Sequence, residues 1–222
     1  MRDFQYIPIS FVSCYNYFII NYYYPEYDDK KNHRYVNLTS FINAIVTGIP
    51  SLLIVSEKNI IPFLSQTNPT TIDIYYKLPP LILYGYSLYE LHYFIFRKHQ
   101  LDMLLHGLMM FSFLSLSIYF NSTHLTNIAI MQEMSSIFLN IRVNDFINLL
   151  FFLAYSYYRI YFFPKLCIEY FYTEPYNYNI YYLTILGMIT SNSLNFFWYI
   201  KLVKIFTKTL YNKFVKPVYG TL

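Results

Sequence analysis

Long apolar stretches separated by short polar links run along the whole chain of 222 residues. A helix needs about 20 apolar residues to cross the hydrocarbon core of a bilayer. Stretches of that length lie at about residues 5–24, 37–56, 74–95, 101–120, 145–163 and 179–206. The pattern therefore predicts an all-α, polytopic membrane protein with at least six spans.

The links between these stretches, at 25–34, 57–73, 96–100 and 164–177, are polar or contain proline. No internal repeat, heptad pattern or low-complexity linker interrupts the chain, so a single helical bundle is predicted. Its parts are an N-terminal anchor span and loop at 1–33, a membrane domain at 34–216 and a short tail at 217–222.

A seventh candidate span, residues 123–141, differs from the others because its apolar run holds Gln132 and Glu133. Basic residues concentrate on the cytoplasmic side of membrane proteins, so the distribution of Lys and Arg indicates whether this stretch crosses. With six spans, nine basic residues fall on one side and six on the other. With seven spans, eleven fall on one side and four on the other, while Arg159 lies inside a span in both arrangements. The larger asymmetry favours seven spans, and six are the alternative.

The seven-span arrangement places the N-terminus on the exoplasmic side and the C-terminus in the cytosol. The eleven basic residues of the cytosolic side are Lys30, Lys31, Arg34, Arg97, Lys98, Arg142, Lys201, Lys204, Lys208, Lys213 and Lys216. The four of the opposite side are Arg2, Lys58, Lys77 and Lys165.

The composition agrees with a membrane protein and excludes several kinds of site. Only 13% of the residues are charged, against about 25% in an ordinary globular domain. The two cysteines, Cys14 and Cys167, match no metal-ligand spacing, so neither a disulfide framework nor a metal site is predicted. The chain has no phosphate-binding loop and no nucleophile-elbow motif, and it gives no support for nucleic-acid binding.

Glu133 points to a polar central cavity between the spans. An ionisable side chain at the bilayer centre costs about 2.5–3.5 kcal/mol, so it is expected to face a protein interior rather than lipid. On a helix, Glu133, Ser136 and Asn140 share one face. Arg159 lies within another apolar run and needs an acidic partner. Glu133 is the first candidate for that partner and Glu90 the second.

His106 is the candidate for acid–base chemistry. It follows Asp102 by four residues, so both side chains are expected on the same face of a helix. A carboxylate in that position can fix the tautomer of an imidazole and raise its basicity. The structural alternative is a buried histidine that only forms hydrogen bonds.

Four segments, taken in order, resemble the TLC-domain family, which includes the ceramide synthases and the translocating-chain-associating membrane protein. The segment QEMSSIFLNIR looks like the family's Glu-x-Ser-x-x-Phe-Leu-Asn-x-Arg signature and is the most specific match. The segment LHGLMMFSF lies where the family shows a His-His pair. GYSLYEL and LNFFWYIKLVKIFTK are similar to the family's acidic segment and to its closing helix.

The resemblance implies a bundle of membrane helices around a cavity and a role in lipid metabolism, sensing or trafficking. It also marks residues that line the cavity or bind lipid, and these are Glu90, Glu133, Ser136, Asn140, Arg142, Asn195 and Trp198. Arg159 is added to this set because its charge needs a partner inside the bundle. Two positions depart from the family pattern. Gly107 stands where the second histidine of the pair is expected, and Asn43 stands where many members have a histidine.

Three interpretations of function stay open. The favoured one is a multi-pass protein that handles, senses or organises membrane lipid through an intramembrane cavity. The second is a ceramide-synthase-like acyltransferase with His106 as base and Asp102 as its orienting partner, which would use acyl-CoA as co-substrate. The third is a non-catalytic membrane scaffold. An endomembrane like the endoplasmic reticulum is the expected location, membrane lipid is the expected partner, and no cofactor is expected.

Overall fold

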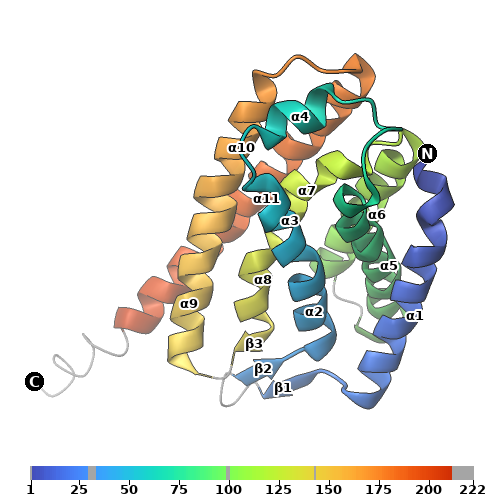
Figure 1. The fold of residues 1–222 in the computed structure, drawn as a ribbon. Helices are drawn as coiled ribbons and strands as arrows, with labels where there is room; N and C mark the ends of the chain where they lie inside the picture. The colour runs from blue at the N-terminus through green and yellow to red at the C-terminus, as the bar shows by residue number, and fades with distance from the viewer. Residues whose placement is uncertain (1, 30–33, 99–100, 143, 212–222) are drawn as a thin grey trace, which may run out of the picture.

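The computed structural model of the chain describes residues 2–29, 34–98, 101–142 and 144–211. Helices make up nearly all of this part, and a small sheet lies at one end of the bundle (Figure 1). The all-α class expected from the apolar runs is therefore confirmed. The chain begins at the end of the bundle opposite to the sheet.

In chain order, the helices of the described residues are α1 (Ile7–Tyr23), α2 (Leu38–Asn43), α3 (Ile49–Val55), α4 (Ile60–Gln66), α5 (Leu78–Tyr93), α6 (Leu101–Tyr119), α7 (Asn127–Ile130), α8 (Glu133–Leu139), α9 (Asp145–Tyr155), α10 (Phe163–Phe171) and α11 (Tyr178–Leu210). Short 3-10 turns occur at Asp3–Tyr6, Ile74–Tyr76 and Thr123–Thr126, and π-helical segments occur at Ala44–Gly48, Phe94–Lys98 and Ser156–Phe162. Every predicted apolar stretch is helical. The helix α4 lies in a predicted link.

The sheet was not predicted from the sequence. It consists of β1 (Tyr27–Asp29), β2 (Arg34–Val36) and β3 (Ile141–Arg142), which pair antiparallel in that order. The hairpin of β1 and β2 occupies the predicted polar link 25–34, and β3 joins it through the register Val36↔Ile141. Asn37 then begins α2, since its side chain accepts a hydrogen bond from the Ser40 N–H at 2.9 Å. The sheet thus ties the start of α2 to the end of α8.

Each of two continuous helical rods carries a π-helical segment that ends two residues before a proline. The rod Leu38–Val55 contains Pro50, and the rod Asp145–Phe171 contains Pro164. Proline lacks an N–H and leaves the carbonyl four residues earlier without its helical donor. In both rods that carbonyl belongs to the π-helical segment. The irregular turn and the proline therefore lie together in each rod, and the helix continues beyond them.

These two rods are also the helices, within the described residues, that are long and apolar enough to cross a membrane. The segment Leu104–Tyr119 of α6 is apolar but shorter. Length and composition alone thus support two spans, fewer than the seven that the apolar runs predict.

The unusual stretch that holds Glu133 forms the centre of the molecule. The stretch contains α7 and α8, which a short break separates. The helix α8 lies between α9 and α2 (Figure 1). Met131 and Ser135 are both 0% exposed, and most of their neighbours in the stretch are buried. The stretch is therefore surrounded by other helices, as an element with internal polar groups requires.

Small residues let α1 pack closely on α5. A Cβ atom added at Gly85 would lie 2.3 Å from the Ser10 carbonyl oxygen and 2.9 Å from the Cys14 backbone nitrogen. The Ser10 hydroxyl donates to the Leu81 carbonyl at 2.7 Å, one turn before Gly85. Contacts of this kind between small residues hold membrane helices together, because backbones can approach and hydroxyls can donate between helices.

Candidate functional site

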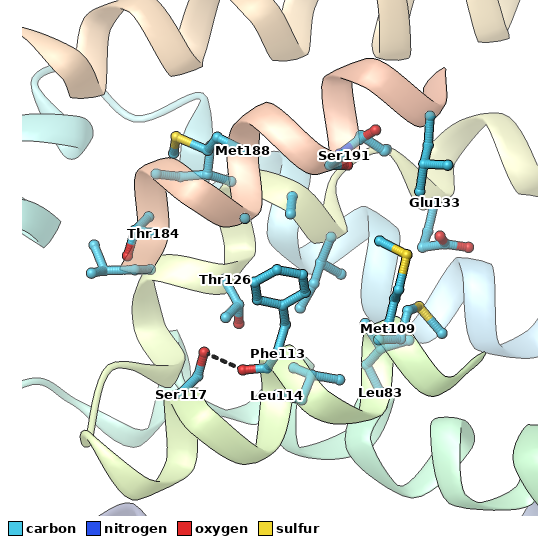
Figure 2. Close-up of a pocket in the computed structure, with 18 of the residues that line it drawn as sticks. Leu83, Met109, Phe113, Leu114, Ser117, Thr126, Glu133, Thr184, Met188 and Ser191 are labelled. Carbon is cyan, nitrogen blue, oxygen red and sulfur yellow. Dashed lines mark hydrogen bonds between the residues drawn. The ribbon is translucent and has the colours of Figure 1, made fainter. Parts of the chain in front are cut away.

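A partly open cavity of about 170 Å³ lies between α6, α11 and the segment that includes α7 and the start of α8 (Figure 2). Apolar side chains make up most of its wall, among them Met109, Phe113, Leu114 and Met188. An engineered cavity of about 150 Å³ in another protein holds one benzene molecule. The volume therefore fits a short segment of one hydrocarbon chain rather than two chains side by side.

Charged and amide side chains gather at one end of this cavity. His106 and Trp198, together with Gln132, Glu133, Arg159 and Asn195, belong to its lining. The sequence predicted all of these as cavity residues except Gln132. The expected polar central cavity is thus polar at this end and apolar along its middle.

Arg159 holds the polar end together. Its Nε donates to the Ser135 hydroxyl at 2.7 Å, and its Nη2 donates to the Ser136 hydroxyl at 3.0 Å. Its Nη1 donates to the Asn195 side-chain oxygen at 3.3 Å. The Nη2 atom also lies 3.6 Å from Glu133 Oε1, which confirms Glu133 as the acidic partner expected from the sequence. One guanidinium therefore connects α8 with α11.

A chain of amide hydrogen bonds extends from Arg159 along the cavity wall. The Asn195 Nδ2 group donates to the Gln132 side-chain oxygen, and Gln132 Nε2 donates to the Ser191 hydroxyl at 3.3 Å. The Tyr155 hydroxyl donates to the Asn195 carbonyl at 3.1 Å. The sequence shows Gln132 as a polar residue beside Glu133, but Gln132 was not predicted to line the cavity. Its position in an apolar run was the signal for that prediction.

His106 has Glu90 of α5 as its acidic neighbour, with 3.8 Å between Nδ1 and Glu90 Oε2. Glu90 is 5% exposed, and its other oxygen accepts a hydrogen bond from the Tyr86 hydroxyl at 3.3 Å. On the cavity side, the His106 ring packs against the Trp198 ring at a centroid distance of 5.6 Å. The expected partner was Asp102, whose side chain lies outside the described residues. The fold brings the carboxylate of Glu90 to His106 from the neighbouring helix α5, and the pairing with Asp102 stays a prediction.

Four of the residues expected in the cavity are not part of its lining, and the first is Glu90, which approaches His106 from α5. Ser136 accepts the hydrogen bond from Arg159 from outside the lining. Asn140 lies at the end of α8, where its carbonyl accepts from the Asn37 N–H at 2.9 Å. Arg142 belongs to β3 and pairs with β2. The conspicuous signature QEMSSIFLNIR therefore serves two purposes, because its first half builds the cavity and its second half joins α8 to the sheet.

The two rods pack closely against α8 near Glu133 and Arg159. Arg159 lies inside the π-helical segment Ser156–Phe162. On the other side of α8, a Cβ atom added at Gly48 would lie 3.1 Å from the Met134 nitrogen and 3.3 Å from the Glu133 Cβ. Gly48 thus lets the rod Leu38–Val55 approach the first turn of α8. The π-helical segments of both rods lie close to Glu133, whose carboxylate is half-buried.

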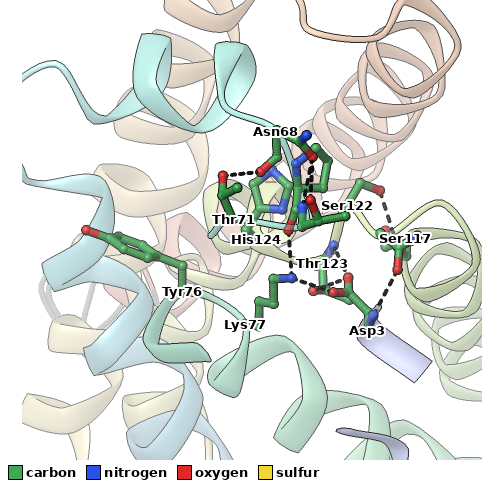
Figure 3. Close-up of polar contacts among 12 residues, drawn as sticks. Asp3, Asn68, Thr71, Tyr76, Lys77, Ser117, Ser122, Thr123 and His124 are labelled. Atoms are coloured by element: carbon green, nitrogen blue, oxygen red, sulfur yellow. Dashed lines mark hydrogen bonds and ion pairs between the residues drawn. The ribbon is translucent and has the colours of Figure 1, made fainter. Parts of the chain in front are cut away.

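A second polar cluster lies next to Ser117 and Ser122, which line the opposite end of the cavity (Figure 3). The Lys77 ammonium lies 2.7 Å from Asp3 Oδ1, and these side chains are 1% and 0% exposed. Asp3 Oδ2 also accepts hydrogen bonds from the hydroxyl and the N–H of Thr123, at 2.7 and 3.2 Å. Lys77 donates in addition to the Pro69 carbonyl at 2.8 Å. The sequence analysis treated Lys77 only as a marker of topology and missed this buried pair.

The described residues contain no group of three or more His, Cys, Asp and Glu side chains that could hold a metal ion. The chemistry of the polar end is therefore that of one guanidinium, two carboxylates, an imidazole and amides. Such a set can donate and accept hydrogen bonds to a polar head, and it can move a proton through His106.

The architecture defines a helical protein with an internal cavity that is charged at one end and apolar in its middle. A family model for the TLC domain matches residues 35–204. The chain belongs to this family, whose members are membrane-embedded and associated with lipid. Comparison with curated proteins and with solved structures gave no match.

The ion pair between Glu133 and Arg159 predicts an asymmetric response to mutation. Arg159→Leu leaves the half-buried Glu133 carboxylate without its cation and is expected to cost about 3 kcal/mol of unfolding free energy, at the low end for buried pairs. Glu133→Leu is expected to cost less, because Arg159 keeps its hydrogen bonds to Ser135, Ser136 and Asn195. The double variant is expected to be more stable than Arg159→Leu alone. Unfolding in mixed detergent micelles measures all three, and strictly additive losses would contradict the pairing.

Proposed function

We propose that the chain is a seven-span membrane protein that handles, senses or organises membrane lipid by holding one lipid chain in its internal cavity. The observation that carries this proposal is the polarity of the cavity. Its middle is lined by apolar side chains such as Met109 and Leu114, while one end holds the charged pair Glu133 and Arg159. A single-chain amphiphile has the same division between head and tail.

The donors and acceptors at the polar end favour a head group that can do both. Arg159 and Asn195 supply N–H groups, and Glu133 supplies a carboxylate beside them. Because Glu133 and Arg159 offset each other's charge, a neutral or zwitterionic head fits this end better than a strongly charged one. Hydroxyl groups of a lipid head can donate to a carboxylate and accept from an amide.

The distribution of charge along the fold supports seven spans with a cytosolic C-terminus. The sheet end of the bundle holds the strand positions of Arg34 and Arg142 and the segment that ends at Lys98, while α11 carries Lys201, Lys204 and Lys208. A hydrogen bond from the Tyr93 hydroxyl to Glu26, at 3.3 Å, ties the end of α5 to this same end. Basic residues mark the cytoplasmic side, so the sheet end is assigned to the cytosol of an endomembrane like the endoplasmic reticulum.

Opposite locations are expected for the two termini. Epitope tags at residue 1 and after residue 222 are read after selective permeabilisation of the plasma membrane. The C-terminal tag should be accessible to antibody, and the N-terminal tag should become accessible only after full permeabilisation. Identical behaviour of the two tags would exclude an odd number of spans.

Filling the cavity is expected to expel the lipid. Ala129 lines the cavity on α7, and Ala129→Phe places a ring inside it. The wild-type protein purified in mild detergent should retain a specific lipid that mass spectrometry identifies, and Ala129→Phe should lose most of it. Ala129→Ser is the matched control, because it changes the same position with little added volume. The proposal fails when the bound lipid is the same in all three proteins.

The second candidate function is acyl transfer from acyl-CoA to a lipid amine or hydroxyl, and the pair of His106 and Glu90 favours it. The distance of 3.8 Å places Nδ1 next to the carboxylate, which leaves Nε2 as the nitrogen able to take a proton from a ligand. Gly107 occupies the position where the second histidine of the family pair is expected. A Cβ atom there would point at Leu91 and Glu90 of α5, at 3.4 and 3.6 Å. Position 107 therefore faces the contact with α5.

A conservative change at His106 separates the two candidates. His106→Gln keeps a side chain able to form hydrogen bonds but cannot act as a base near neutral pH. The lipid composition of membranes that contain His106→Gln is expected to equal that of wild-type membranes, because lipid handling needs no proton transfer. Quantitative lipidomics of membranes with wild type, with the variant and without the protein measures this. A lipid product present only with wild type would establish the acyltransferase function instead.

A further inference from the structure

The ring of Phe113 lies across the middle of the cavity (Figure 2). On one side of the ring are Met109 and Glu133, next to the polar end described above. On the other side are Ser117, Thr126 and Thr184, which line a compartment toward the cluster of Asp3 and Lys77. All of these residues line one cavity, so the ring narrows it between its polar end and its far end.

The ring of Phe113 packs against Gly187 of α11. A Cβ atom added at Gly187 would lie 3.2 Å from Phe113 Cε1 and 3.4 Å from Cδ1. Such distances are short for a carbon–carbon contact, so the ring occupies the space that a larger residue at position 187 would fill. Phe113 and Gly187 thus bridge α6 and α11. The rings of His106 and Trp198 form a second bridge between the same helices at the polar end.

The far compartment has polar residues in its wall, but their hydroxyl donors are already used. The hydroxyls of Ser117 and Thr184 donate to the carbonyls of Phe113 and Ile180, at 2.8 and 2.9 Å. The Thr126 hydroxyl donates to the Thr123 carbonyl at 2.6 Å. An apolar chain that entered the compartment would leave no hydroxyl donor of these residues without a partner. The compartment is therefore compatible with hydrocarbon once the ring no longer blocks it.

We infer that Phe113, seated on Gly187, sets the maximum length of the lipid chain that the cavity holds. This inference rests on the proposed function. A chain whose head lies near Glu133 extends along Met109 until it meets the ring, and further methylenes cannot be buried. Removal of the ring widens the passage to the far compartment and lets longer chains gain affinity.

The test uses the full-length protein in detergent and a series of saturated monoacylglycerols of increasing chain length. Their head groups carry hydroxyls that can donate and accept, and dissociation constants come from the ligand dependence of thermal unfolding. Each buried methylene is expected to tighten binding about fourfold, the equivalent of about 0.8 kcal/mol. In the wild type this gain should stop at a limiting chain length.

Phe113→Ala should move that limit to chains longer by several methylenes, and Phe113→Leu should give an intermediate limit. The leucine variant also decides the question where Phe113→Ala does not fold. Phe111→Ala is the matched control, because Phe111 lies on the same helix but stacks on Tyr84 of α5 at a centroid distance of 5.3 Å. Its limit should equal that of the wild type.

An unchanged limit in the Phe113 variants, with binding of short chains intact, would overturn the inference and leave the proposed function standing. A shift of the same size in Phe111→Ala would also overturn it, because the ring would then act through general packing. If neither wild type nor the variants bind any member of the series, the proposed function fails and the inference fails with it.

Discussion

A guanidinium keeps its proton at any pH a protein encounters, so Arg159 needs partners wherever the fold buries it. It is 9% exposed, and it satisfies its donors with Ser135, Ser136 and Asn195 in addition to the ion pair with Glu133. These partners come from two other helices, so α8 and α11 have little freedom to slide or rotate against the rod that carries Arg159. The amide chain through Gln132 then extends the same constraint along one wall of the cavity.

Arg159 in turn lies in an irregular, π-helical segment of its helix. A regular α-helix through Pro164 would lose a hydrogen bond and bring the proline ring against the carbonyl of Ile160. The π-helical segment Ser156–Phe162 contains both Ile160 and Arg159, so the irregular part of the helix is the part that carries the guanidinium. π turns are frequent at functional sites. Here the side chain on the π turn is the one that assembles the polar end.

The sequence predicted those features that depend on local periodicity or on the cost of burial. Apolar runs identified the helices, and the cost of a lone buried charge identified the pair of Glu133 and Arg159. It could not predict features that depend on how helices are rotated against each other. The approach of Glu90 to His106 is of this kind, because it depends on how α5 packs on α6 and not on spacing within one helix. The pair of Asp3 and Lys77 escaped notice because 74 positions separate its members.

The two ends of the cavity differ in what they leave for a ligand, and this difference bears on function more than the cavity's size does. At the far end, the hydroxyls of Ser117 and Thr184 donate to carbonyls of their own helices. A ligand there needs only to fit the shape of the wall, because it need not accept a hydrogen bond from these hydroxyls. At the polar end, Glu90 Oε2 and His106 Nδ1 are buried and, among the described residues, have no hydrogen-bond partner at normal distance, although they lie only 3.8 Å apart. Unmade hydrogen bonds of this kind are costly in a buried site. The polar end thus keeps unused hydrogen-bonding capacity next to the cavity, whereas the hydroxyl donors of Ser117 and Thr184 at the far end are already used.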